Sequence, residues 1–308
     1  MKKYYRIMLG AKSIYAEECY KGSFIGADFD IKQDLCNELP DNWRDFNQKF
    51  IPVWLEKHSG KSKVSAGLAC GALWTISKGI KTGDIVLCPD GAGNYHVGEA
   101  VSNYYYKSGA ILPHRRNVKW YTSAIERLAM SDALRYSTGS IGTVSDITKY
   151  AEEIEELLGV TKPPTVFTTD ESIETPVEFA LEKHLEAFLV QNWKQTELGK
   201  KYDIYEEDGE LVGPQYQSDT GPMDILAISK DRKTLLVVEL KKGRVSDNVV
   251  GQVQRYMGYV KEELAETNQQ VRGVIIALED DIRIKRALSV TSGIDFYRYQ
   301  VSFKLFKV

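Results

Sequence analysis

Three charged side chains interrupt two apolar, strand-forming runs in the second half of the chain. Asp224 follows a Gly-Pro-Met sequence and begins one run, while Glu239 and Lys241 lie two residues apart inside the other. Because alternate side chains of a strand point to the same face, Glu239 and Lys241 project together. A charged pair inside an apolar run is costly unless something uses it. Two carboxylates and an ammonium on paired strands therefore predict a site for a divalent cation and a phosphate.

The alternative interpretation places the Glu-x-Lys pair on the solvent face of an edge strand, where lysine is common. The sequence that follows argues against it. A helix is predicted from residue 246 to about 263, and Gln252 and Tyr256 lie four residues apart on one of its faces. A polar face of this kind, directly after the strand, favours a functional site.

A second helix is predicted before the strands, from residue 176 to about 192. It carries Glu182 and Glu186, again four residues apart, and both flank its apolar stripe. Either glutamate could be a third acidic group of the site, and either could be an ordinary surface charge.

The order of these groups resembles the PD-(D/E)xK nuclease superfamily. The sequences LEKHLEAFL at 181–189, VELK at 238–241 and GQVQRY at 251–256 resemble its NucS-like endonuclease branch most closely. The resemblance covers about residues 170–300 and favours Glu182 slightly over Glu186. It implies an α/β restriction-endonuclease-like domain, with a mixed sheet flanked by helices.

The resemblance also implies a division of labour among the site residues. Asp224, Glu239 and the carbonyl of Leu240 would ligate Mg²⁺ or Mn²⁺, which prefer hard oxygen ligands. Lys241 would orient a metal-activated water or stabilise the negative charge that develops on the phosphate. The helix residues would contact phosphate or orient the site. The implied catalytic set is Asp224, Glu239, Lys241, Glu182, Gln252 and Tyr256.

The first half is predicted to be α+β and rich in strands. Strands are expected at 4–9, 101–106 and 118–121, and a hairpin is expected from 84–88 to 95–101 because a Gly-rich turn separates its two apolar runs. This turn joins two strands and lacks the Gly-Lys-Ser/Thr of a phosphate loop.

This half resembles a PUA-like domain of the EVE and YTH type, and similar sequence segments occur in the N-terminal modules of Mrr-like restriction nucleases. The resemblance is carried by GIKTGDIVL at 79–87, VGEAV at 97–101 and LPHRRNVKW at 112–120. It covers about residues 1–125, apart from a region at 40–75 that does not align. It implies a small twisted barrel, and several such domains bind a flipped modified base in an aromatic pocket.

Base flipping needs aromatic surfaces for stacking and polar groups for the base edge. Stacking would come from aromatic residues, the base edge would be read by an aspartate, and phosphates would be held by a basic cluster. The alternatives are core packing for each tryptophan, a turn or cap for the aspartate and a solvated turn for the basic cluster. The candidates are Tyr20, Phe24, Asp28, Trp43, Trp54, Trp74, His114, Arg115, Arg116, Lys119 and Trp120.

Length and composition indicate two domains in a chain of 308 residues with a net charge of −3. A glycine, a proline pair and a polar run after residue 158 predict a linker at 161–175, between a recognition domain at 1–160 and a nuclease domain at 176–308. The four cysteines are widely spaced, no apolar run is long enough for a bilayer, and no signal peptide is evident. We therefore expect a prokaryotic cytoplasmic protein with reduced thiols and no membrane partner.

The two halves predict a Mg²⁺-dependent DNA endonuclease of a modification-dependent or defence-type restriction system. Its partner would be DNA, including DNA with modified bases, and a homodimer is expected because cutting both strands usually needs two active sites. One alternative is a DNA-repair endonuclease that acts on mismatched, branched or single-stranded substrates. The other is a nuclease-fold protein that binds nucleic acid without catalysis.

Overall fold

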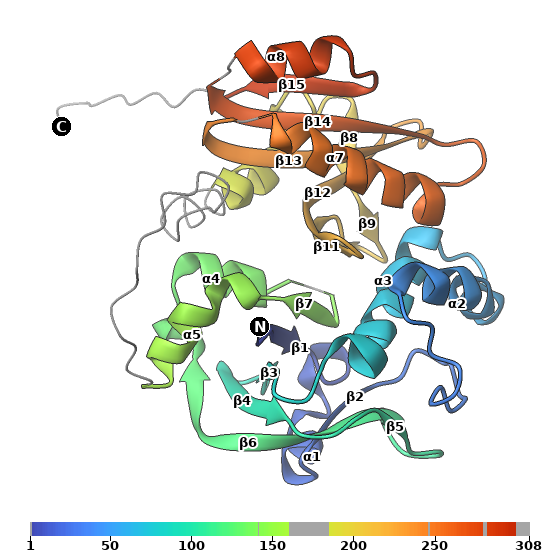
Figure 1. Ribbon diagram of the computed structural model, residues 1–308, viewed down its shortest axis with the longest axis vertical. Helices are drawn as coiled ribbons and strands as arrows, with labels where there is room; N and C mark the ends of the chain where they lie inside the picture. Colours follow the sequence, from blue (N-terminus) through green and yellow to red (C-terminus); the bar gives the residue numbers. More distant parts are fainter. Residues whose placement is uncertain (1, 141, 160–184, 246, 280–281, 300–308) are drawn as a thin grey trace.

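The computed structural model describes residues 2–140, 142–159, 185–245, 247–279 and 282–299. Two sheets lie at opposite ends of the molecule, one built from the N-terminal half and the other from the C-terminal half (Figure 1). Within the described ranges, no helix combines the length and the apolar character that a bilayer crossing requires.

The N-terminal sheet has the order β2-β6-β4-β3-β1-β7, and β5 pairs with β6. The expected hairpin is confirmed, since β3 and β4 pair antiparallel from Ile85 opposite Glu99 to Pro89 opposite Tyr95. The strands are β1 (Tyr4–Ile7), β2 (Phe24–Ala27), β3 (Ile85–Pro89), β4 (Asn94–Ala100), β5 (Tyr105–Tyr106), β6 (His114–Glu126) and β7 (Val144–Asp146).

Polar side chains cap the N-terminal helices at the positions where the chain turns into them. Asn42 accepts a hydrogen bond from the backbone N–H of Asp45, and Ser62 accepts one from that of Ser65. These two caps begin α2 and α3. Both helices lie in the region at 40–75, which could not be aligned with the PUA-like family. The N-terminal helices are α1 (Ala16–Lys21), α2 (Trp43–Lys57), α3 (Lys63–Trp74), α4 (Asp132–Thr138) and α5 (Ala151–Leu157).

The C-terminal sheet has the order β11-β12-β13-β14-β15, with β8 also paired to β12. It is mixed, because β12 and β13 are antiparallel whereas β13, β14 and β15 are parallel. Its strands are β8 (Tyr202–Ile204), β11 (Pro214–Ser218), β12 (Gly221–Ser229), β13 (Thr234–Arg244), β14 (Gln270–Glu279) and β15 (Ile294–Arg298), beside a ribbon of β9 (Glu206–Glu207) and β10 (Glu210–Leu211). The helices are α7 (Asn248–Tyr259), a π-helical turn at Val260–Leu264, and α8 (Ile282–Ser289), and residues 185–191 are also helical.

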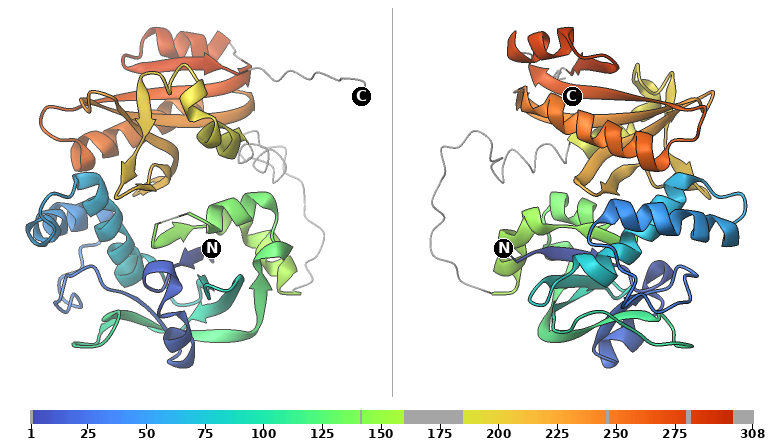
Figure 2. Two further views of the ribbon diagram at one scale, coloured as in Figure 1. Left: turned by 180° about the vertical axis from the view of Figure 1, so that it is seen from behind. Right: turned by 45° about the vertical axis from the view of Figure 1, so that its right-hand side comes forward.

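Helices α2 and α3 lie between the two sheets at one side of the molecule, and α4 faces the C-terminal unit at the other (Figures 1 and 2). Val64 of α3 belongs to the same buried apolar cluster as Tyr216 of β11, whose hydroxyl donates to the Val64 carbonyl at 2.9 Å. The amide of Asn47 on α2 donates to Glu263 at 2.6 Å. The region that the sequence left unaligned thus joins the two units.

Sequence and structure differ chiefly in the lengths of elements. The strand expected at 101–106 is reduced to β5, and the strand expected at 118–121 is the middle of the much longer β6. The predicted linker at 161–175 and the first part of the helix expected from 176 lie outside the described residues. The PUA-like barrel remains a prediction.

Candidate active site

Strands β12 and β13 bring the two carboxylates of the predicted site together. Their antiparallel register places Ile225 opposite Val238, so Asp224 and Glu239 occupy the adjoining positions. The carboxylate of Asp224 accepts a hydrogen bond from the backbone N–H of Leu240 at 2.8 Å, which fixes it beside β13. Local strand propensity on both sides of each acid therefore builds this part of the site.

Glu239 and Lys241 share one face of β13, as their spacing predicts. The ammonium of Lys241 lies 3.5 Å from Glu239 Oε1, with the lysine side chain 20% exposed and that of Glu239 only 4%. The edge-strand alternative is wrong, because β13 lies inside the sheet between β12 and β14. Burying a carboxylate is costly even beside an ammonium, which marks this position as more than a solvated charge.

Glu186 supplies a third carboxylate from the helical residues 185–191. It is 1% exposed, and the amide of Gln215 donates both to Glu186 Oε2 at 2.7 Å and to Asp224 Oδ1 at 3.3 Å. The expected helix glutamate, Glu182, lies outside the described residues. Of the two glutamates that the sequence left open, Glu186 is placed in the site.

Gln215 holds this arrangement from β11, and sequence reasoning did not identify it. Its φ angle of 52° lies in the left-handed region, which is unfavourable for a residue with a side chain. A glutamine in a short polar strand carries no sequence signal of such a role. Its importance follows only from the two carboxylates that its amide bridges.

The N-terminal unit also reaches this site. Burial, together with the charge and a side-chain hydrogen bond of Glu186, raises the pKa of Tyr136 on α4. Burial chiefly, with Glu186 and Asp224 adding to it, also raises the pKa of Tyr150. Both hydroxyls therefore stay protonated at neutral pH beside the acidic groups. Their sequence context, far from the predicted nuclease motif, gave no sign of this.

Helix α7 places Gln252 and Tyr256 against the backbone that leads into Asp224. Tyr256 donates to the carbonyl of Pro222 at 2.9 Å, and the amide of Gln252 lies 3.3 Å from the Tyr256 hydroxyl. Burial first, and then the charge of Glu239, raises the pKa of Tyr256 to about 12. The helical spacing of four thus produces the expected shared face, and the pair supports the strand that carries Asp224.

The donor set fits a hard divalent cation. Carboxylate oxygens of Asp224, Glu239 and Glu186 and the nearby Leu240 carbonyl are ligands typical of Mg²⁺ or Mn²⁺, and excess negative charge at a buried site favours such an ion. Within the part of the chain that the structure describes, no three His, Cys, Asp or Glu side chains are already arranged around a common metal position. Mg²⁺ commonly keeps several waters among its ligands, so it does not require a complete cage of protein groups.

Three members of the basic cluster of the N-terminal half are buried in β6, and their expected contact with phosphate is wrong; the fourth, Lys119, is exposed. His114, Arg115 and Arg116 are at most 5% exposed. His114 Nε2 lies 2.7 Å from the Ile31 carbonyl. Their other hydrogen-bond partners are also largely backbone carbonyls: those of Ile111 and Leu112 for Arg115, and those of Ile76, Ser77 and Ser102 for Arg116. Donors that already satisfy buried carbonyls are not available to a ligand.

Three other candidates for base binding are engaged elsewhere. Phe24 is buried, with the Arg115 guanidinium 3.7 Å from its ring centroid. Asp28 is exposed and accepts from the N–H of Asp30, which is the turn alternative. Trp120 is half-buried beside Tyr20, at 5.7 Å between ring centroids.

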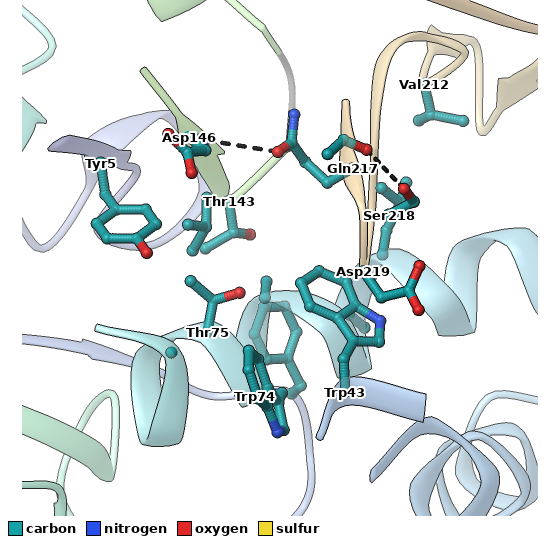
Figure 3. Close-up of a pocket in the computed structure, with 18 of the residues that line it drawn as sticks. Tyr5, Trp43, Trp74, Thr75, Thr143, Asp146, Val212, Gln217, Ser218 and Asp219 are labelled. Atoms are coloured by element: carbon teal, nitrogen blue, oxygen red, sulfur yellow. Dashed lines mark hydrogen bonds between the residues drawn. The ribbon is translucent and has the colours of Figure 1, made fainter. Parts of the chain in front are cut away.

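Trp43 and Trp74, in contrast, line a common cavity between the two units (Figure 3). Their ring centroids are 5.6 Å apart. Of the predicted stacking residues, these two and Trp54 are thus brought together, whereas Phe24 and Trp120 are not among the cavity's lining residues.

Comparisons with known proteins match the two halves separately. Residues 191–300 match the family described as the endonuclease NucS C-terminal domain, and residues 5–148 match one described as a domain of unknown function, DUF8426. The chain is 35% identical over 75 residues to the endonuclease NucS of Methanocaldococcus jannaschii, a match covering 24% of this chain and 27% of that protein. It therefore spans only about a quarter of this curated relative's length.

Two solved structures resemble this chain with low TM-scores. A repair endonuclease from Pyrococcus abyssi is 16% identical, with 69% of this chain and 66% of that one covered, at a TM-score of 0.31. An EndoMS complex with double-stranded DNA is 13% identical, with 68% and 63% covered, at a TM-score of 0.32. The family match supports a NucS-like endonuclease domain in the C-terminal half.

Proposed function

We propose that this protein is a metal-dependent DNA endonuclease, and that its substrates are DNA molecules with irregular structure, such as mismatches or flaps. The observation that carries the proposal is the grouping of buried Glu239 with half-buried Asp224 and Lys241 inside the region that matches the NucS endonuclease family. The Gln215 bridge from Asp224 to Glu186 adds a third carboxylate to the same place.

Each residue has a role that follows from its chemistry. Asp224, Glu239 and the Leu240 carbonyl would hold Mg²⁺ or Mn²⁺. When bound, the ion supplies Lewis-acid chemistry by polarising phosphate oxygens and acidifying water. Lys241, beside Glu239, is placed to stabilise negative charge on a phosphate. Tyr256 donates to the Pro222 carbonyl, and Gln252 donates to the Tyr256 hydroxyl. The pair thereby fixes the start of the strand that carries Asp224.

Repair fits the matches better than restriction does. The restriction interpretation depends on a PUA-like module and on a basic cluster that binds phosphate, and His114, Arg115 and Arg116 of that cluster are buried in β6. The C-terminal match is to the NucS endonuclease family, for which the sequence resemblance allows mismatched, branched or single-stranded substrates. Cleavage of DNA with modified bases therefore becomes the second candidate, and the same assay distinguishes it.

The test incubates the full chain and Mg²⁺ or Mn²⁺ with matched DNAs that are unmodified, mismatched, flapped, or carry methylcytosine or hydroxymethylcytosine. We expect cleavage that depends on a mismatch or flap and is abolished by EDTA. Glu239→Gln keeps the side-chain volume but removes the charge, and it should slow cleavage by about 100-fold or more. Gel analysis of single-turnover cleavage gives these rates.

The matched control is Asp203→Asn on β8, an exposed acid paired with Lys230 in the same sheet, and it should leave the rate unchanged. Cleavage restricted to modified DNA would replace repair by restriction. If Glu239→Gln cut as fast as the unaltered chain, the assignment of the catalytic centre would be wrong.

A further inference from the structure

Strand β1 carries a buried cation, Arg6, that the candidate active site does not use. Arg6 is 2% exposed, and its Nη1 donates to the backbone carbonyl of Gly142. Its Nε–H is also buried and has no hydrogen-bond partner. Buried donors are nearly always paired, so a donor left over in this way indicates a bound acceptor.

Two other buried arginines of the N-terminal sheet do not share this feature. The Nε of Arg115 donates to the Leu112 carbonyl at 2.9 Å, and the Nε of Arg116 donates to the Ile76 carbonyl at 2.5 Å. Both side chains are thus held by the fold itself, whereas that of Arg6 is only partly satisfied.

The charge of Arg6 is also poorly offset. Burial lowers the pKa of Arg6 to about 10, so the side chain stays protonated at neutral pH. The groups that act on this pKa besides burial are Tyr95, Cys88 and a second cation, Arg127, and none of the three is a carboxylate. Arg127 itself donates to the Tyr95 hydroxyl at 3.0 Å. Two cations therefore lie near one tyrosine, and an anion beside them would be stabilised.

A pair of serine hydroxyls lies next to Arg6. Ser145 of β7 is directly opposite Arg6 in the sheet, so the two side chains share one face. Ser145 Oγ is 2.7 Å from Ser140 Oγ. The pair has two O–H donors and its mutual hydrogen bond uses one, which leaves one for another acceptor. Asp146, the next residue, faces the opposite side of the sheet because strand side chains alternate.

This hydroxyl pair opens on a small cavity between the two units. Ser140, Gly142 and Ser145 line it on one side, and Gln215 of β11 lines it on the other. Its volume of about 20 Å³ is enough for one water-sized oxygen atom but not for a whole ligand. A ligand would therefore insert a single oxygen and keep its remaining atoms outside.

The cavity borders the candidate active site through β11. Gln215 donates from its amide to the carboxylates of Glu186 and Asp224. Two residues further along β11, Gln217 accepts a hydrogen bond from the backbone N–H of Asp146 at 3.5 Å (Figure 3). An oxygen bound in the cavity would thus lie against the residue that bridges two acids of the nuclease centre.

We propose that this cavity binds one oxygen of a phosphate-type oxyanion, held by the Ser140–Ser145 hydroxyl pair and by the positive charge of Arg6 behind it. Two sources supply such an oxyanion: a phosphodiester of DNA near the one that is cut, or a free phosphate compound. The DNA source rests on the proposed function, whereas the binding of an oxyanion does not.

The test titrates inorganic phosphate into the full chain by isothermal titration calorimetry, with the ionic strength held constant by sodium chloride. EDTA is present, so that no metal ion can hold phosphate at the nuclease centre. We expect saturable binding of phosphate, and no such binding of chloride in the matched titration.

Two variants locate the binding and two serve as controls. Ser145→Ala and Arg6→Gln should each weaken phosphate binding by about 10-fold or more, because each removes a hydrogen bond or a charge that acts on the anion. Ser145→Ala removes one oxygen atom, so it keeps the test decisive if Arg6→Gln fails to fold. Ser102→Ala and Lys119→Gln remove a hydroxyl and an exposed cation of the same unit away from the cavity, and both should bind phosphate normally.

The same titration in the presence of saturating flapped duplex DNA distinguishes the two sources. Loss of phosphate binding would identify a DNA phosphodiester as the occupant. Arg6→Gln should then also reduce the slope of log Kd for DNA against log salt concentration by about one. Phosphate binding that DNA leaves unchanged would identify a free phosphate compound.

The proposal is overturned if phosphate shows no saturable binding, or if both Ser145→Ala and Arg6→Gln bind it as well as the unaltered chain. Lys241→Gln separates this result from that for the nuclease. It should abolish cleavage in Mg²⁺ and leave phosphate affinity unchanged, so failure of the endonuclease assay alone does not decide the role of Arg6. Loss of phosphate binding in Lys241→Gln would place the anion at the nuclease centre and contradict the proposal.

Discussion

At the scale of single residues, the site combines groups from both halves of the chain. Glu186 is contacted by Gln215 from the C-terminal sheet and by Tyr136 from helix α4 of the N-terminal unit. Hydrogen bonds to a buried carboxylate stabilise its charge and fix its direction. Tyr136 is therefore a positioning residue, acting on the substrate only through the glutamate that it contacts.

Tyr136→Phe tests this role with a minimal change. Loss of the hydroxyl leaves Glu186 less restrained, so we expect cleavage to slow by about 10-fold, in the range typical of outer-shell partners. Because the pKa of Tyr136 is raised, its hydroxyl stays protonated in any ordinary assay, and the defect should be equal at pH 7 and pH 9. Single-turnover rates at the two pH values check this.

Tyr105→Phe is the control, because its hydroxyl donates to Asn117 within the N-terminal sheet. It should cut DNA at the normal rate. An equal loss in both variants would mean that tyrosine hydroxyls support the fold generally, and that Tyr136 has no particular link to Glu186.

The acidic and basic groups of β12 and β13 could be predicted because strand alternation and antiparallel pairing are local rules. Asp224, Glu239 and Lys241 are placed together by those rules alone. Gln215 and Tyr136 could not be predicted, since their roles depend on segments that meet only in the folded chain. The buried arginines of β6 were misjudged for the same reason: the carbonyls that they satisfy belong to other elements.

At the scale of elements, helix α3 approaches the C-terminal unit unusually closely at Gly67. A Cβ atom built there would lie 2.6 Å from Leu264 Cδ2 and 2.9 Å from the Tyr216 hydroxyl. These distances are shorter than normal contacts, so with a larger residue either the buried side chains of Leu264 and Tyr216 or the helix itself must shift. The glycine is therefore needed for the packing of two elements rather than for its own backbone angles.

Gly67→Ala should accordingly lower the free energy of unfolding by about 1–3 kcal/mol, because overpacking outweighs the better helix propensity of alanine. Gly258→Ala is the matched change in α7, where nothing lies within 4 Å of the built Cβ. That variant should be neutral or more stable by up to about 1 kcal/mol. Urea denaturation measures both, and a stabilised Gly67→Ala would contradict the close approach.

At the scale of the whole molecule, the contact between the two units contains a titratable group. Glu263 is 8% exposed and accepts a hydrogen bond from Asn47. Burial chiefly raises the pKa of Glu263 to about 7; the charge of Asp219 adds to this, while the Asn47 hydrogen bond and Arg44 oppose it. The protonated carboxyl is thus the form that fits this contact.

The sign of the pH effect follows from the raised pKa. The contribution of Glu263 to stability is fully present below pH 4.5, its ordinary pKa, and is lost as pH rises through about 7. Glu263→Gln cannot ionise, so relative to it the unaltered chain should lose about 1–2 kcal/mol of unfolding free energy across that interval. Denaturation curves at several pH values give the difference, and a constant difference would exclude a raised pKa.

The packing of Val64 against Tyr216 also limits which recombined genes can encode a folded protein. An exchange of the first 160 residues by recombination would remove α2 and α3, and with them the cover of an apolar patch on the C-terminal sheet. A foreign partner would have to supply both a matching apolar helix and a small residue at the place of Gly67. The two halves are therefore expected to remain in one gene during evolution. Chimaeric proteins should fold only when α2 and α3 are kept with the nuclease half.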